Sequence, residues 1–139
     1  MAEMSRDLIE SGLGWRYTPP RMAALIRERE TMALVACDGP QIHGFAVMHF
    51  GDDEAHLTLL CVQPPQRHRG IGRGMIEWMV ASARVAGITA IRLELRADNG
   101  SALAFYQRLG FVQTQSVPGY YSGQVTARCM TLRLDAAAP

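Results

Sequence analysis

This sequence has few cysteines, almost no excess of one sign of charge and no long apolar run, and each of these shortages excludes a class of protein. The chain holds three cysteines, none of them in a Cys-x-x-Cys pair, so neither a disulfide framework nor a zinc site is expected. No stretch approaches the ~20 apolar residues of a membrane span, and the first residues carry charge where a signal peptide needs an apolar run. The formal net charge is only +1, which gives no general attraction to nucleic acid or to an anionic membrane. We therefore expect a cytoplasmic protein that binds no metal, no nucleic acid and no membrane.

What is present indicates one compact domain. The chain has 139 residues, of which 48% are hydrophobic and 19% are charged. A chain of this length can bury a single core without disulfides or a structural metal. No internal repeat or low-complexity segment interrupts it, so we expect one domain over residues 1–139.

Hydrophobic spacing and turn residues predict a mixed α/β or α+β sheet. Helical spacing predicts helices over residues 2–13, 18–30, 70–86 and 101–109. Extended patterns predict strands over residues 32–37, 42–50, 55–62, 88–96, 111–117 and 124–134. The turns at 38–40 and 51–53 join the first three strands into an antiparallel meander. The following helix is then a crossover connection to the next strand.

A basic, glycine-punctuated turn lies between the third predicted strand and the crossover helix. It reads Arg67-His68-Arg69-Gly70-Ile71-Gly72. Glycines allow the backbone to approach a ligand, and the N–H groups and dipole of a helix start favour an anion. A phosphate-binding loop is the functional interpretation. An ordinary strand-to-helix turn with solvated arginines is the open alternative.

Two other phosphate-binding motifs fit the sequence poorly. The glycines at 70, 72 and 74 do not have the Gly-x-Gly-x-x-Gly spacing of a dinucleotide fingerprint, and no strand with an acidic residue follows at the expected place. The chain contains no Gly-Lys-Ser/Thr, which excludes a P-loop.

The strand predicted over residues 88–96 alternates between apolar and charged side chains. Arg92, Glu94 and Arg96 share one face. A strand inside such a sheet is ordinarily apolar on both faces, so this face either meets solvent or lines a cleft. A carboxylate in a cleft can remove a proton from an ammonium substrate. Burial would raise the pKa of Glu94 toward this task, and the arginines would oppose the change. A surface Arg-Glu-Arg ladder is the alternative.

Three segments together resemble the GNAT superfamily of acetyltransferases. They are Arg67-x-x-Gly70-x-Gly72 after an apolar strand, Leu93-Glu94-Leu95-Arg96-Ala97-Asp98-Asn99, and Phe105-Tyr106-Gln107-Arg108-Leu109-Gly110-Phe111. The resemblance covers about residues 33–134. Within the superfamily the chain is most similar to the ribosomal-protein alanine N-acetyltransferases, notably in the Leu-Glu-Leu-Arg-Ala-x-Asn run.

The resemblance implies a fold, a co-substrate and a set of site residues. The fold is the GNAT acetyl-CoA-binding fold, and the co-substrate is acetyl-CoA. Glu94 matches the proposed general base, and Tyr106 matches the acid that protonates the departing thiolate. Contact with the pantetheine arm falls to Leu60, Cys61 and Val62, and contact with the pyrophosphate falls to Arg67, His68, Arg69, Gly70, Ile71 and Gly72. Asn99 would also touch the cofactor.

Several of these residues have other interpretations. Without the resemblance, Tyr106 is more typical of a core aromatic residue on a helix. His56 is a second candidate base or part of an acceptor pocket, and a surface histidine at a strand end is its plainer alternative. Cys61 is expected to be a packed strand residue, because direct transfer is preferred over an acyl-enzyme. Tyr120 and Tyr121 either rim the acceptor site or pack in a turn.

The sequence therefore predicts an N-acetyltransferase whose acceptor is a primary amine, either a protein N-terminus or a small molecule. A non-catalytic acyl-CoA-binding regulatory module is the rival, and it would need neither Glu94 nor Tyr106. GNAT domains usually open with a β-strand, whereas this chain begins within what resembles the first helix, so that strand is expected to be absent. Its former neighbour would be an exposed edge, which would either pair with another chain, as in a homodimer, or be covered by the protein's own terminus.

Overall fold

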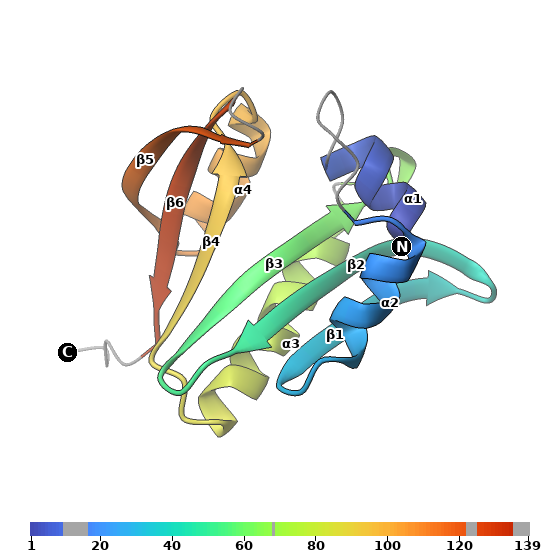
Figure 1. Cartoon of the computed structure of the whole chain (residues 1–139), viewed down its shortest axis with the longest axis horizontal. Helices are drawn as coiled ribbons and strands as arrows, with labels where there is room; N and C mark the ends of the chain where they lie inside the picture. The colour runs from blue at the N-terminus through green and yellow to red at the C-terminus, as the bar shows by residue number, and fades with distance from the viewer. Residues whose placement is uncertain (10–16, 68, 122–124, 135–139) are drawn as a thin grey trace.

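A computed structural model describes residues 1–9, 17–67, 69–121 and 125–134. Figure 1 shows a single twisted sheet with helices on both faces. The helical elements are α1 (Ala2–Met4), the π-helix η1 (Ser5–Ile9), α2 (Pro19–Arg27), the 3₁₀ helix η2 (Pro64–Gln66), α3 (Ile71–Val85) and α4 (Gly100–Arg108). The strands are β1 (Thr31–Asp38), β2 (Gln41–Phe50), β3 (Glu54–Val62), β4 (Ala90–Arg96), β5 (Val112–Tyr121) and β6 (Val125–Arg133).

The sheet has six strands in the order β1-β2-β3-β4-β6-β5. The first three strands pair antiparallel and form the predicted meander. β3 and β4 are parallel, with the crossover helix α3 between them in sequence. β4 and β6 pair antiparallel, and β6 pairs with β5 in the same way. The mixed sheet that the sequence predicts is confirmed.

Two apolar clusters lie on opposite faces of the sheet. One gathers buried side chains from α3, α4 and the strands, including Met79, Leu93 and Met130. The other gathers side chains from α1, α2, β2 and β3, including Met4 and Met22. In Figure 1, α1 and α2 lie in front of the sheet and α3 lies behind it. We call these the α3 face and the α1/α2 face.

A β-bulge in β3 changes which of its side chains point to each face. Val47 pairs with Leu59 and Met48 pairs with Leu57, so Thr58 is the extra residue opposite β2. Before the bulge, Leu57 belongs to the cluster on the α3 face. After it, Leu59 belongs to the cluster on the α1/α2 face. A bulge shifts the two-residue alternation of a strand by one, which accounts for this change.

The N-terminal segment begins in helix, as expected. The helix predicted over residues 2–13 forms as α1 followed by the π-helix η1, and residues 10–13 lie outside the described part of the chain. Within the described residues before Thr31, no strand is present. β1 is therefore an edge of the described sheet.

Candidate active site

β3 and β4 separate at the centre of the sheet, as Figure 1 shows. Their parallel pairing is recorded only at Glu54↔Ala90, Ala55↔Ile91 and His56↔Arg92. The bulge at Thr58 follows directly and bends β3 away. Beyond His56, the edge of β3 that faces β4 has no described strand partner. An extended ligand could therefore add to this edge through backbone hydrogen bonds.

The three strand residues predicted to meet pantetheine lie on this free edge, with their side chains on alternate faces. Leu60 and Val62 pack against the cluster on the α3 face, whereas Cys61 is buried in the cluster on the α1/α2 face. Burial raises the pKa of the Cys61 thiol to about 11, against the opposing effects of Arg67 and the N-terminal ammonium. The thiol is protonated at neutral pH, which argues against an acyl-enzyme on Cys61.

The glycine-punctuated turn lies between η2 and α3. Gly70 is the N-cap of α3 in the left-handed region, at φ 81°, and the space beside its Cα is open. The Nε of Arg67 donates to the carbonyl of Val62 at 3.1 Å, and Nη1 of Arg69 donates to Gln66 Oε1 at 3.2 Å. Both guanidiniums are exposed and lie beside the helix start. His68 lies outside the described residues.

Gly72 has a packing role that the sequence does not reveal. It is buried in the first turn of α3, and a Cβ there would lie 3.2 Å from Cζ of Phe105 and 3.7 Å from Cγ2 of Val62. Gly72 therefore allows α3 to pack closely against the side chain of Phe105 in α4. Its neighbour Ile71 packs against the core cluster on the α3 face.

Asn99 and Tyr106 both lie on or beside α4. The Oδ1 of Asn99 accepts from the backbone N–H of Ala102 at 3.1 Å, so Asn99 is the N-cap of α4. Tyr106 is 7% exposed and makes edge-to-face ring contacts with Phe105 and Phe111. The ring of Tyr106 thus packs in the core, as the plainer interpretation of this residue expects.

Glu94 lies in a hydrogen-bonded cluster where β3 and β4 separate. The Nε2 of His56 is 2.7 Å from Oε1 of Glu94, and the hydroxyl of Tyr120 donates to the same oxygen at 3.0 Å. Burial would raise the pKa of Glu94, but the hydrogen bond and charge of His56, the hydrogen bond from Tyr120 and the charge of Arg92 lower it overall. Burial and Arg92 act on this pKa in the directions that the sequence predicts, but the partners His56 and Tyr120, which the sequence does not place beside Glu94, make the overall change a lowering.

The two arginines of the same strand face form ion pairs with other carboxylates. The Nε of Arg92 lies 2.8 Å from Oε1 of Glu54, and the Nε of Arg96 lies 3.1 Å from Oδ1 of Asp98. Glu94 instead bonds to a histidine and a tyrosine. The charged face of β4 is thus not a simple Arg-Glu-Arg ladder.

The sequence named the members of this cluster separately but did not place them together. His56 and Glu94 are 38 positions apart, and Tyr120 comes from a third strand. Only the parallel register of β3 and β4 brings His56 and Glu94 to the same face. No residue pattern in the sequence marks Thr58 or the bulge. Its hydroxyl lies 3.3 Å from Nδ1 of His56.

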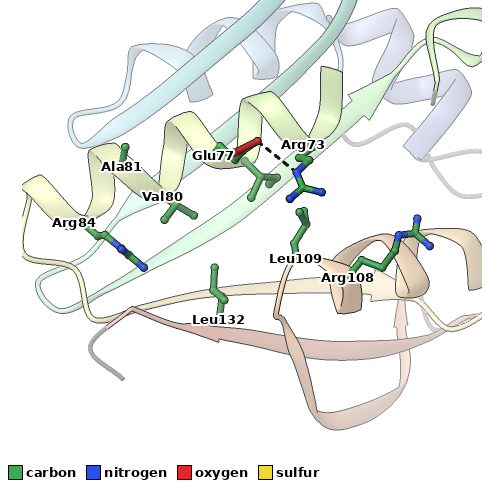
Figure 2. Close-up of a pocket in the computed structure, with 9 residues that line it drawn as sticks. Arg73, Glu77, Val80, Ala81, Arg84, Arg108, Leu109 and Leu132 are labelled. Carbon is green, nitrogen blue, oxygen red and sulfur yellow. Dashed lines mark ion pairs between the residues drawn. The ribbon is translucent and has the colours of Figure 1, made fainter. Parts of the chain in front are cut away.

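A separate groove of about 470 Å³ lies on the α3 face. Figure 2 shows it between α3 and the segment from the end of α4 to β6, with arginines on its rim. Its lining residues are Arg73, Ile76, Glu77, Val80, Ala81, Arg84, Arg108, Leu109 and Leu132. None of the predicted site residues is among them, so this groove is distinct from the cluster around Glu94.

Two further findings concern metals and membranes. Among the described residues, no group of three or more histidine, cysteine, aspartate or glutamate side chains is arranged to hold a metal ion. No helix in the described part of the chain is long and apolar enough to cross a bilayer.

The separated parallel strands, the basic turn before α3 and the polar cluster beside them define an acyltransferase-like fold. Residues 3–111 match the Acetyltransferase (GNAT) family, and the chain belongs to that family. Over 77 residues it is 35% identical to the [ribosomal protein bS18]-alanine N-acetyltransferase of Salmonella typhimurium, an alignment that covers 55% of this chain. That alignment covers 52% of the relative, so the chain matches about half the length of this enzyme.

Solved structures agree with this family. Ard1 from Thermoplasma volcanium superposes with a TM-score of 0.84 at 27% identity, covering 96% of this chain and 88% of that one. The ribosomal-protein-S18-alanine N-acetyltransferase of Escherichia coli superposes with a TM-score of 0.75 at 26% identity, covering 85% and 78%. The GNAT resemblance of the sequence is confirmed.

Proposed function

We propose that this chain, as one domain, transfers an acetyl group from acetyl-CoA to a primary amine by direct attack. The observation that carries the proposal is the separation of β3 and β4 after His56↔Arg92, with Glu94 on the face toward α1 and α2. The separation leaves a free strand edge for an extended acyl carrier. It also places a carboxylate beside that edge, where a proton must leave the attacking nitrogen.

The co-substrate would enter along the free edge of β3. Backbone groups of Leu60, Cys61 and Val62 would hold its pantetheine arm as an added strand does. The turn from Arg67 to Gly72, with its exposed guanidiniums and the N-terminal end of α3, would hold the pyrophosphate. Asn99 would contribute a further contact from the start of α4. A backbone N–H near Val62 would polarise the thioester carbonyl and stabilise the developing oxyanion.

Two groups of side chains would carry out the proton transfers. An amine arrives largely as ammonium, so the carboxylate and imidazole of Glu94 and His56 would remove a proton before attack. Tyr106 would supply the proton that ends on the coenzyme sulfur. Because the ring of Tyr106 packs in the core, only its hydroxyl group would take part in this proton transfer.

The acceptor is proposed to be the N-terminal amine of a protein or peptide. The relative from Salmonella typhimurium is by its name an enzyme acting on an alanine of a ribosomal protein. A small amine is the second candidate. Tyr120 is 47% exposed and lies beside Glu94. It suits either acceptor, because an aromatic ring next to a carboxylate can contact both the ammonium group and the adjoining apolar part of an amine substrate.

Turnover of acetyl-CoA should be measured against a panel of N-terminal peptides and small amines, with wild type and Glu94→Gln side by side. We expect acetylated product with at least one class of amine, and a loss of roughly 10²–10⁴-fold in kcat for Glu94→Gln at unchanged acetyl-CoA affinity. Tight acetyl-CoA binding without turnover for every amine would favour the rival function, a non-catalytic acyl-CoA-binding module.

A further inference from the structure

His56 lies at the point in the sheet where β3 and β4 separate. It is the last residue of β3 that pairs with β4, and the bulge at Thr58 begins two residues later. Its ring points to the same side as Glu94, and the two side chains are 33% and 16% exposed. His56 is thus the more accessible of the two and stands at the point where the strands part.

The short contact with Glu94 fixes the hydrogen positions on the ring. A carboxylate can only accept hydrogen bonds, so Nε2 of His56 must carry the hydrogen that lies toward Glu94 Oε1 at 2.7 Å. In a neutral imidazole the other nitrogen, Nδ1, then has a free lone pair. Its described neighbour is the hydroxyl of Thr58 at 3.3 Å, and this hydroxyl can turn instead to the backbone carbonyl of His56 at 3.5 Å.

Glu94 is a weak proton acceptor in this arrangement. Its Oε1 already accepts from His56 and from Tyr120. Despite the burial that would raise it, the pKa of Glu94 lies below its ordinary value, mainly because of the hydrogen bond and charge of His56. A carboxylate with a lowered pKa holds a proton poorly at neutral pH, whereas imidazole is the side chain whose ordinary protonation range spans neutral pH.

We propose that His56 is a catalytic residue that takes the proton of the acceptor ammonium at Nδ1, and that Glu94 orients and stabilises it. This inference rests on the proposed function. The N–H bond of the ammonium breaks and a bond from that proton to Nδ1 forms, directly or through one water held near Thr58. The resulting imidazolium keeps its Nε2–H on Glu94.

The remaining steps balance the reaction. The freed nitrogen lone pair attacks the acetyl carbon, the C–N bond forms and the C–S bond breaks. The second proton lost from the nitrogen ends on the coenzyme sulfur. His56 then releases its proton to solvent, through its exposed edge.

Other titratable groups surround the pair, and each belongs to a different strand. Arg92 of β4 pairs with Glu54 of β3 at 2.8 Å. His49 of β2 is the cross-strand neighbour of His56, and Cys129 of β6 is the neighbour of Glu94. Tyr120 of β5 bonds to Glu94 directly. His56 is the histidine that contacts the carboxylate.

The test compares His56→Gln with the matched control His49→Gln. Both residues are histidines at paired positions of adjacent strands, but His49 bonds only weakly to Thr31, at 3.4 Å. A glutamine at position 56 can still donate from its amide nitrogen to Glu94, although it cannot accept a proton. We expect His56→Gln to lower kcat by about 10²–10⁴-fold with acetyl-CoA affinity and melting temperature unchanged. His49→Gln should stay within about twofold of wild type.

The pH profile supplies a readout that a purely structural role would not move. Without a base, turnover depends on amine that is already deprotonated in solution, and α-amines have an ordinary pKa of about 7.7–8.0. The deficit of His56→Gln should therefore shrink as pH rises past that range. A constant deficit across pH, or near-normal activity of His56→Gln at neutral pH, would show that His56 only positions Glu94.

A measurement on the wild-type protein tests the geometry without any activity. Nitrogen-15 NMR of the histidine rings at neutral pH should show His56 with its hydrogen on Nε2 and a bare Nδ1. A hydrogen on Nδ1 instead would overturn the proposal, because the accepting atom would be blocked. If the wild type acetylates no amine, the proposed function fails and the role of His56 fails with it. An active wild type with an active His56→Gln refutes only the inference about His56.

Discussion

Gly72 and Gly74 offer a matched pair for testing why the turn before α3 is rich in glycine. Both lie in the first turn of α3. A Cβ at Gly74 would meet nothing within 4 Å, whereas one at Gly72 would press on Cζ of Phe105 at 3.2 Å. Replacing a helical glycine by alanine stabilises a helix by up to about 1 kcal/mol. Crowding a packed contact costs roughly 1–3 kcal/mol.

We therefore expect Gly74→Ala to raise stability by about 0.5–1 kcal/mol. In Gly72→Ala the same gain in helix propensity should be offset by the cost of displacing the ring of Phe105, so that this variant is destabilised by roughly 0–2 kcal/mol. The two variants should therefore differ by about 0.5–3 kcal/mol, which corresponds to roughly 2–10 °C in melting temperature for a domain of this size. Thermal unfolding followed by circular dichroism, without ligand, measures it. Equal melting temperatures, or a more stable Gly72→Ala, would refute the argument that Gly72 serves helix packing.

Three further predictions follow from the site. Asparagine tolerates a positive φ, so Gly70→Asn should leave the fold largely intact. Its side chain would project into the open space beside Gly70 and block the approach of the phosphate to the backbone. Calorimetry should therefore show acetyl-CoA binding that is at least roughly tenfold weaker. Tyr106→Phe keeps the ring packing and should lower kcat by about 10–100-fold at unchanged melting temperature, and full activity where chemistry limits the rate would exclude the acid role. Because the folded pKa of Glu94 is lowered, its contribution to stability is present above the ordinary glutamate range and is lost as pH falls through the folded value. Tyr120→Phe removes one of the lowering hydrogen bonds, so acid unfolding followed by circular dichroism should begin at a higher pH than in wild type, and an unchanged onset would contradict this.

The predictable parts of the fold were those encoded by local spacing. The turn at 38–40 and the stop at Gly87 set the ends of their elements within a few residues, because turn residues and hydrophobic period act over short distances. Helical spacing predicts a helix at the N-terminus, and the second part of that helix, Ser5–Ile9, is a π-helix. Residue spacing alone does not distinguish an α-helix from a π-helix.

The parts that could not be predicted depend on contacts between distant strands. The 2.7 Å contact of His56 with Glu94 requires the parallel register of β3 and β4, which no local pattern specifies. The lowered pKa of Glu94 follows from that contact. The packing role of Gly72 was likewise hidden, because it depends on where the ring of Phe105 lies. The residue types of the site could be read from the sequence, but not their partners.

The bulge at Thr58 has a consequence for how this protein can diversify. Because the alternation of β3 shifts there, His56 before the bulge lies on the α1/α2 face, while Leu60 after it packs on the α3 face. The side chains of His56 and Leu60 thus lie on opposite faces of the sheet, although an unbroken two-residue alternation would place them on the same face. Under the proposed function, mutations on the α1/α2 face can alter which amine is accepted without disturbing the grip on a common acyl donor. If the proposed function holds, a lineage with this architecture can change its acceptors by small steps while the donor stays the same.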